Sequence, residues 1–119
     1  MTIEQCYQEM GGNYTEVCGR LPSQRLVEKF VAKFPNDDSY DTLCEAMARQ
    51  DRTEAFRAAH TLKGVAANLG FSRLTNSASQ LTEALRPESA VVCQLSPSLM
   101  DAVTQDYRAT MDAIHAFLG

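Results

Sequence analysis

The sequence of 119 residues lacks several features that would mark particular classes of protein. It has no run of lysine and arginine, and its net charge at pH 7 is −4, so neither a nucleic-acid backbone nor an anionic membrane is expected to be its main partner. It has no apolar run near bilayer-spanning length and no signal-peptide pattern at its start. We therefore predict a cytoplasmic protein whose residues 1–119 form one domain.

Cysteine and metal frameworks are also missing. The four cysteines show no CxxC spacing and lie among apolar residues, which favours free thiols over the two disulfides that they could form in a secreted chain. They are Cys6, Cys18, Cys44 and Cys93. The two histidines, His60 and His115, are far apart, and no Cys, His, Asp and Glu residues have ligand spacing. We expect no metal site.

What the sequence does contain is helical spacing of apolar residues between glycine and proline breaks. No segment alternates apolar and polar residues as a strand would. Helices are predicted over about residues 2–10, 23–34, 38–49, 51–69 and 72–86, and from Pro97 to Leu118 after a linker containing Val91 to Leu95 and the cap Ser96. One apolar stripe on each main helix and short connections predict an all-α fold, an antiparallel helical bundle.

The helical spacing also predicts which side chains face the core. In chain order they are Val27, Phe30, Val31, Phe34; Tyr40, Leu43, Cys44, Met47; Ala55, Ala59, Leu62, Ala66, Leu69; Leu74, Ala78, Leu81, Leu85; and Leu99, Val103, Tyr107, Ile114, Leu118. Asp51 and Glu54 have the spacing of a capping box. Gly70 suits the left-handed residue after a helix, with Phe71 folding back, and Ser72 is expected to cap the next helix.

The stretch AHTLKGVAANLG, residues 59–70, carries the strongest chemical signal. At about 100° per residue, the apolar stripe centres on the side of the helix away from His60, so its imidazole should point outward. An exposed imidazole is largely neutral at pH 7 and is then a nucleophile. Lys63 could place an ammonium beside a phosphoryl group on that ring, and Gly64 would leave room for it.

The same spacing also fits a surface histidine beside an unrelated lysine, with Gly64 admitting a neighbouring helix. The next helix should be level with His60 about ten residues after the turn at Gly70, so Gln80 or Thr82 is a candidate to orient the imidazole. Basic and apolar side chains nearby form a candidate docking surface for an acidic partner site. Its members are Phe56, Arg57, Ala67 and Arg86, with Lys63 adding positive charge.

AHTLKGVAANLG and the continuation FSRLTNSASQLTEALR together resemble the central hairpin of histidine-containing phosphotransfer (HPt) domains over about residues 51–86. The resemblance implies an antiparallel four-helix bundle, here with a short extra N-terminal helix, in which His60 is phosphorylated. Lys63 matches the lysine that contacts the phosphoryl group, and Gly64 matches the glycine that keeps the site open.

One position departs from the family pattern. The family often has Gln or Glu twenty-two residues after the histidine as its orienting neighbour, and this chain has Thr82 there. Gln80 or Glu83 could take that role instead.

The resemblance also implies partners: a sensor histidine kinase and response-regulator receiver domains, whose bound Mg²⁺ and acidic cluster supply most of the catalysis. The protein itself would then be a phosphoryl carrier, not an enzyme, with no cofactor of its own and a monomer between encounters. The alternative is a helical interaction module that docks a kinase or receiver domain without being phosphorylated. A histidine kinase fragment is disfavoured, because the chain has no glycine-rich phosphate loop.

Overall fold

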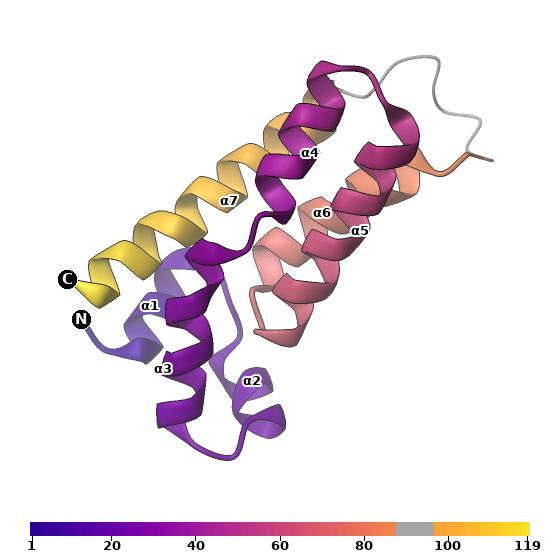
Figure 1. Cartoon of the computed structure of the whole chain (residues 1–119). Helices are drawn as coiled ribbons and strands as arrows, with labels where there is room; N and C mark the ends of the chain where they lie inside the picture. The colour runs from indigo at the N-terminus through magenta and orange to yellow at the C-terminus, as the bar shows by residue number, and fades with distance from the viewer. Residues whose placement is uncertain (88–96) are drawn as a thin grey trace.

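The computed structural model describes residues 1–87 and 97–119, and no strand occurs in these two ranges. The α-helices are α1 (Ile3–Met10), α2 (Tyr14–Arg20), α3 (Gln24–Lys33), α4 (Ser39–Ala48), α5 (Arg52–Asn68), α6 (Ser72–Leu85) and α7 (Pro97–Leu118), and the 3-10 helix η1 (Phe34–Asn36) follows α3 (Figure 1). The predicted all-α class is therefore confirmed. The expected linker Val91 to Leu95, the cap Ser96 and Cys93 lie outside the described residues.

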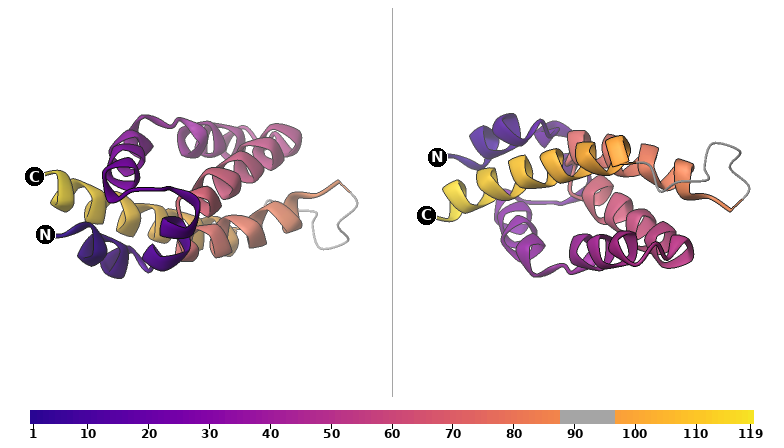
Figure 2. Two further views of the ribbon diagram at one scale, coloured as in Figure 1. Left: turned by 90° about the horizontal axis from the view of Figure 1, so that it is seen from below. Right: turned by 90° about the horizontal axis from the view of Figure 1, so that it is seen from above.

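The helices form two groups along a molecule of 44 × 26 × 19 Å. α4, α5 and α6 lie beside the N-terminal part of α7, whereas α1, α2 and α3 gather at the end of the molecule where both termini lie (Figures 1 and 2). α5 packs against α4 and α6, and α7 packs against α6 and α1. Tyr40 of α4 stacks on Tyr107 of α7 with ring centroids 3.9 Å apart, so α4 also reaches α7.

Local signals in the sequence define both ends of α5. The Asp51 carboxylate accepts a hydrogen bond from the backbone N–H of Glu54 at 3.1 Å. Only this half of the expected capping box forms, because the Asp51 N–H donates to the Ala46 carbonyl at 2.9 Å. At the other end, Gly70 has φ 72°, and the N–H of Phe71 donates to the Ala66 carbonyl at 2.9 Å, as in a Schellman motif.

The helix start after this turn corrects one expectation. Ser72 is the first residue of α6 and not its cap, and Phe71 occupies the N-cap position without a side-chain bond. The tight turn at Gly70 leaves a single residue between the glycine and the helix, so Ser72 already has helical backbone. The Arg73 N–H is satisfied elsewhere, by the carbonyl of Gly11 at 3.2 Å.

The predicted stripes of α5 and α6 are all buried, and residues from every α-helix contribute to the core. Two predicted core residues are wrong: Phe30 is 39% exposed and Leu118 is 49% exposed. α3 buries Val27 and Val31, while Phe30 lies beyond the edge of that face, and Leu118 is the last residue of α7, where the core ends. Five other predicted residues are only half-buried: Tyr40, Cys44, Met47, Leu99 and Tyr107.

The N-terminal segment is tied to the turn between α5 and α6. The Tyr7 hydroxyl donates to the Leu69 carbonyl at 2.6 Å, and the Asn13 N–H donates to the Gly70 carbonyl at 2.7 Å. α2, which the sequence analysis did not predict, follows directly and is capped by the Asn13 side chain. The turn below the α5–α6 hairpin is thus held by residues some sixty positions earlier in the chain.

The cysteines and the lengths of the helices bear on two further expectations, free thiols and no membrane-spanning segment. Cys6 is buried, Cys18 is exposed and Cys44 is half-buried, and all three are free thiols. Within residues 1–87 and 97–119, no helix combines the length and apolar character needed to cross a membrane.

Candidate functional site

α5 presents His60 to solvent on the side of the helix away from its buried residues. Its neighbours Ala59 and Leu62 are buried, whereas His60 is exposed, as the periodicity predicted. Lys63, one turn further on, is half-buried, and Gly64 is exposed. The surface around the imidazole is therefore open on the side of Gly64.

Gly64 does not serve close packing with a neighbouring helix. A Cβ atom built on it would meet no heavy atom within 4 Å, and its backbone is helical. The fold therefore gives no packing reason for a glycine here. This finding excludes the alternative in which Gly64 admits a neighbouring helix.

An aromatic ring lies beside His60. The rings of Phe56 and His60 are nearly parallel, with an interplanar angle of 10° and centroids 6.1 Å apart. The guanidinium carbon of Arg86, at the end of α6, lies 5.4 Å from the centroid of the Phe56 ring. Arg86 in turn pairs with Glu83 through its Nε atom. A chain of contacts thus runs from Glu83 and Arg86 at the end of α6 through Phe56 to the imidazole.

Among the described residues, no candidate orienting residue makes a hydrogen bond to His60. Thr82 is fully buried, and its hydroxyl donates to the Ala78 carbonyl at 2.7 Å. A threonine within a helix readily makes this bond to the preceding turn, which removes Thr82 as a neighbour of the imidazole. Gln80 is exposed, and in the described part of the chain no hydrogen bond joins it to His60.

The candidate docking residues have different surroundings. Arg57 pairs with Glu54 at 3.7 Å and lines a polar hollow between α4 and α5. Ala67 is half-buried near α2, and its carbonyl accepts a hydrogen bond from Arg20 at 2.7 Å. Phe56 lies beside His60, and Arg86 lies over the Phe56 ring.

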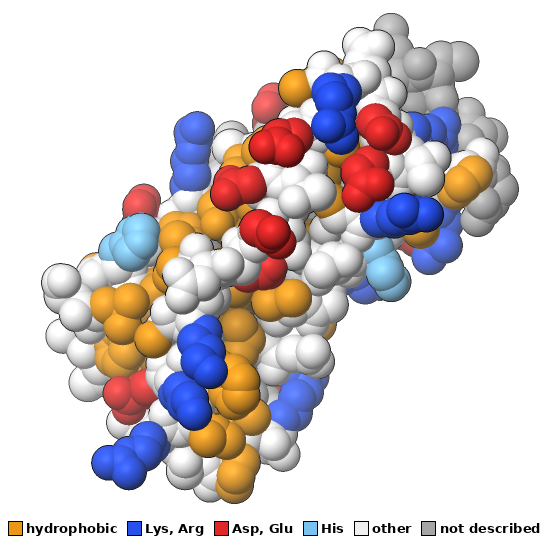
Figure 3. Space-filling model, in the orientation of Figure 1, with side chains coloured by type: hydrophobic (Ala, Val, Ile, Leu, Met, Phe, Trp, Pro, Cys, Tyr) orange, Lys and Arg blue, Asp and Glu red, His pale blue; other side chains and the backbone are white. Residues whose placement is uncertain are grey.

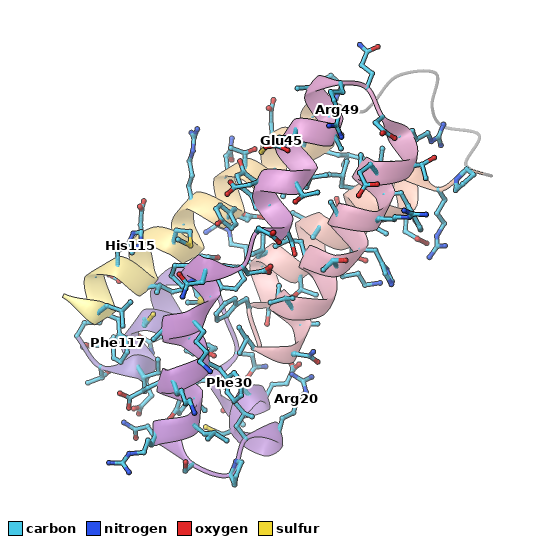
Figure 4. All side chains as sticks on the ribbon, viewed as in Figure 1. Arg20, Phe30, Glu45, Arg49, His115 and Phe117 are labelled. Carbon is cyan, nitrogen blue, oxygen red and sulfur yellow. The ribbon has the colours of Figure 1, made fainter. Side chains whose placement is uncertain are left out.

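The sequence analysis missed a surface hollow of about 470 Å³ at the C-terminal end of α5. Its lining is mostly apolar and consists of Leu21, Phe30, Lys33, Phe34, Asp37, Val65, Asn68 and Leu69. Phe30 is its exposed aromatic residue, and the Lys33 ammonium lies 5.8 Å from the ring centroid. Apolar surface bordered by lysine and arginine is visible at this end of the molecule, where Phe30 and Arg20 project (Figures 3 and 4). The exposure of Phe30 gives no signal in the sequence, because its spacing matches the buried stripe of α3.

No group of three or more His, Cys, Asp or Glu side chains that could hold a metal ion occurs among the described residues. A comparison with protein-family models matches residues 25–116 to the Hpt domain, nearly the whole chain. Comparisons with curated proteins and with solved structures gave no match. The matched range includes α5, α6 and every residue around His60 described above.

Proposed function

The chain belongs to the Hpt domain family, and on that premise we propose that His60 is the residue that accepts and donates the phosphoryl group. Hpt domains are phosphocarrier modules of two-component signalling and not enzymes, and they interact with receiver domains and histidine kinases. The observation that carries the assignment to His60 is its exposure beside Gly64, whose missing side chain no packing contact explains.

The chemistry requires an unprotonated ring nitrogen. Its lone pair attacks the phosphorus of a phospho-aspartate on a receiver domain, a P–N bond forms, and the P–O bond breaks with its electron pair returning to the aspartate carboxylate. A proton leaves the other ring nitrogen to water, and the reverse sequence passes the phosphoryl group to a second aspartate. Mg²⁺ on the receiver would offset charge on the phosphoryl oxygens, and this chain would supply no cofactor.

Lys63 and Gly64 would act on the incoming group in different ways. The Lys63 ammonium, on a flexible stem one turn from His60, would offset the negative charge of the phosphoryl group. Gly64 would leave the space that the receiver's active site needs for a near in-line approach to the imidazole. Neither residue would take part in bond making, so the partner provides most of the catalysis.

The hollow at the C-terminal end of α5 extends the contact surface beyond His60. Val65 and Asn68 lie one to two turns after His60 on the same helix, and Phe30 and Lys33 approach them from α3. An apolar side chain of the receiver would enter this hollow while its acidic site faces His60. Phe56 borders the imidazole, and Arg86 borders the Phe56 ring.

The remaining properties follow from the same proposal. α4, α5, α6 and α7 would form the antiparallel four-helix bundle of the family, with α1, α2 and α3 completing one domain over residues 1–119. We expect a monomer in the cytoplasm that forms transient one-to-one complexes, with neither nucleic acid nor a membrane among its partners. Net charge −4 and an open, unshielded His60 are consistent with such a carrier.

A phosphotransfer assay tests the proposal. The protein is offered a panel of phosphorylated receiver domains and kinases from the same genome, and acid-labile, alkali-stable label is scored, as a P–N bond requires. His60→Gln should abolish labelling and leave the helical content unchanged, because His60 is exposed. His115→Gln is the matched control, since His115 is also an exposed helical histidine, near the end of α7 (Figure 4).

Three outcomes separate the alternatives. Labelling that depends on His60 and not on His115 supports the proposal. Binding of a receiver without labelling would mean an unphosphorylated docking module. Loss of the fold in His60→Gln would contradict the exposed position on which the assignment depends.

A further inference from the structure

The imidazole of His60 lacks the hydrogen-bonding neighbour that the resemblance to HPt domains led us to expect. Thr82 is buried and bonded to its own helix, and no hydrogen bond from a described residue reaches the His60 ring. We propose that Phe56, held in place by Arg86, is the positioning residue for the imidazole. This inference rests on the proposed role of His60 as the phosphoryl acceptor.

The first contact is between the two rings. Phe56 and His60 are four residues apart on α5, so they share a face of the helix, and their rings are parallel to within 10°. The centroid separation of 6.1 Å falls within the range of offset-stacked aromatic pairs. Rotation of the imidazole about its terminal torsion would break this parallel arrangement. Phe56 therefore restricts the plane of the ring that must meet the phosphorus.

Stacking differs chemically from the hydrogen bond that a Gln or Glu would make. A phenyl ring neither donates nor accepts a conventional hydrogen bond, so it fixes the imidazole plane without engaging either ring nitrogen. Both nitrogens remain available to the incoming phosphoryl group and to water.

The second contact fixes Phe56. The guanidinium of Arg86 lies 5.4 Å from the Phe56 centroid, within the distance of a cation–π interaction. Its Nε atom is bound to Glu83, one turn earlier on α6. Arg52, at the start of α5, donates from Nε to the Leu85 carbonyl at 3.0 Å and from an Nη atom to the Ala84 carbonyl at 3.3 Å. These bonds hold the end of α6 against α5, and they therefore fix the position of Arg86 relative to Phe56 and His60.

The positioning role and a docking role predict different kinetics. If Phe56 positions the imidazole, Phe56→Leu lowers the maximal rate of phosphoryl acceptance and leaves the half-saturating donor concentration unchanged. If Phe56 binds the receiver surface, the half-saturating receiver concentration rises instead. A small inorganic donor with a P–N bond, phosphoramidate, makes no docking contact, so it reports positioning alone.

The experiment compares wild type, Phe56→Leu, Phe56→Tyr and the control Phe117→Leu with phosphoramidate and with a phosphorylated receiver domain. Phe117 is a half-buried phenylalanine of α7 near the C-terminus (Figure 4). The C–H proton signals of the His60 imidazole are recorded by NMR for each variant. Arg86→Gln, with exposed Arg49→Gln as its control, tests the base of the stack.

We expect Phe56→Leu to lower the maximal rate about 2-fold to 12-fold with both donors, the range that follows from the strength of aromatic pairs. Phe56→Tyr, which keeps the ring, should restore the rate. The imidazole signals should shift in Phe56→Leu as the ring current of the phenyl group is lost, and stay in place in Phe117→Leu. Arg86→Gln should slow both donors by roughly 2-fold to 5-fold.

Two results would overturn the positioning role: an unchanged phosphoramidate rate in Phe56→Leu, or a rise in half-saturating receiver concentration as the only effect. Imidazole signals that do not respond to Phe56→Leu would show that the rings are not stacked in solution, and this result would also overturn it. If the wild-type protein takes label from neither donor, the proposed function of His60 fails first, and the positioning role fails with it.

Discussion

Replacing Gly64 should stabilise the protein and impair its proposed function at the same time. Gly64 lies in the interior of the 17-residue helix α5, and a Cβ there would meet no atom within 4 Å. Gly64→Ala should therefore gain the full difference in helix propensity, roughly 0.8–1.0 kcal/mol, without a steric cost. For a chain of this length the gain corresponds to an increase in Tm of about 4 °C.

Phosphotransfer should change in the opposite direction. Alanine adds one methyl group beside His60, whereas Gly64→Leu fills the space through which a receiver would approach, so transfer should slow with side-chain size. Gly19→Ala is the matched control, because Gly19 is also an exposed helical glycine with nothing within 4 Å of an added Cβ. It should leave transfer unchanged.

Thermal unfolding by circular dichroism and single-turnover transfer from a phosphorylated receiver measure the two effects. Wild-type transfer by Gly64→Leu would refute the argument that the glycine provides access. A fall in Tm for Gly64→Ala would contradict the open space around Gly64, because it would mean that the added methyl group makes a steric clash.

Three further predictions concern stability. Tyr7→Phe removes the only donor described for the buried Leu69 carbonyl and should cost about 1–3 kcal/mol in urea unfolding; an unchanged midpoint would contradict this bond. Burial and nearby Glu9 raise the pKa of the Cys6 thiol from 9.0 to about 11. Because the folded state holds the thiol proton more tightly than the unfolded state, the free energy of unfolding should be highest below about pH 9. It should then fall by on the order of 2 kcal/mol as the pH rises toward 11. Cys6→Ala, which has no thiol to titrate, should not show this fall. Asp51→Ala removes the N-cap of α5 and should cost about 1 kcal/mol, detectable as a lower Tm.

The fold was predictable where one local pattern determined the outcome. The i, i+4, i+7 and i+11 spacing of Ala55, Ala59, Leu62 and Ala66 defined the buried face of α5, and the exposure of His60 followed from the same periodicity. Gly70 ended α5 because it adopts positive φ without the steric cost of a Cβ.

Other features depended on contacts between distant residues and could not be predicted in this way. α2 is short, and its capping residue Asn13 is positioned by a bond to Gly70 rather than by a local pattern. The hollow that Arg57 lines between α4 and α5 also depended on how these two helices pack together. The stack of Phe56 under Arg86 required the register between α5 and α6, which hydrophobic periodicity does not specify.

The hydrogen bonds from the N-terminal segment to the α5–α6 turn make this segment part of the unit that unfolds cooperatively. The family match starts at residue 25, yet Tyr7 and Asn13 supply the donors for the Leu69 and Gly70 carbonyls, and α1 packs along α7. A chain shortened to the matched range would leave these carbonyls without their donors and expose the core side that α1 covers. The α5–α6 hairpin that carries His60 should therefore unfold together with α1. A chain truncated at the family boundaries should be less stable than residues 1–119.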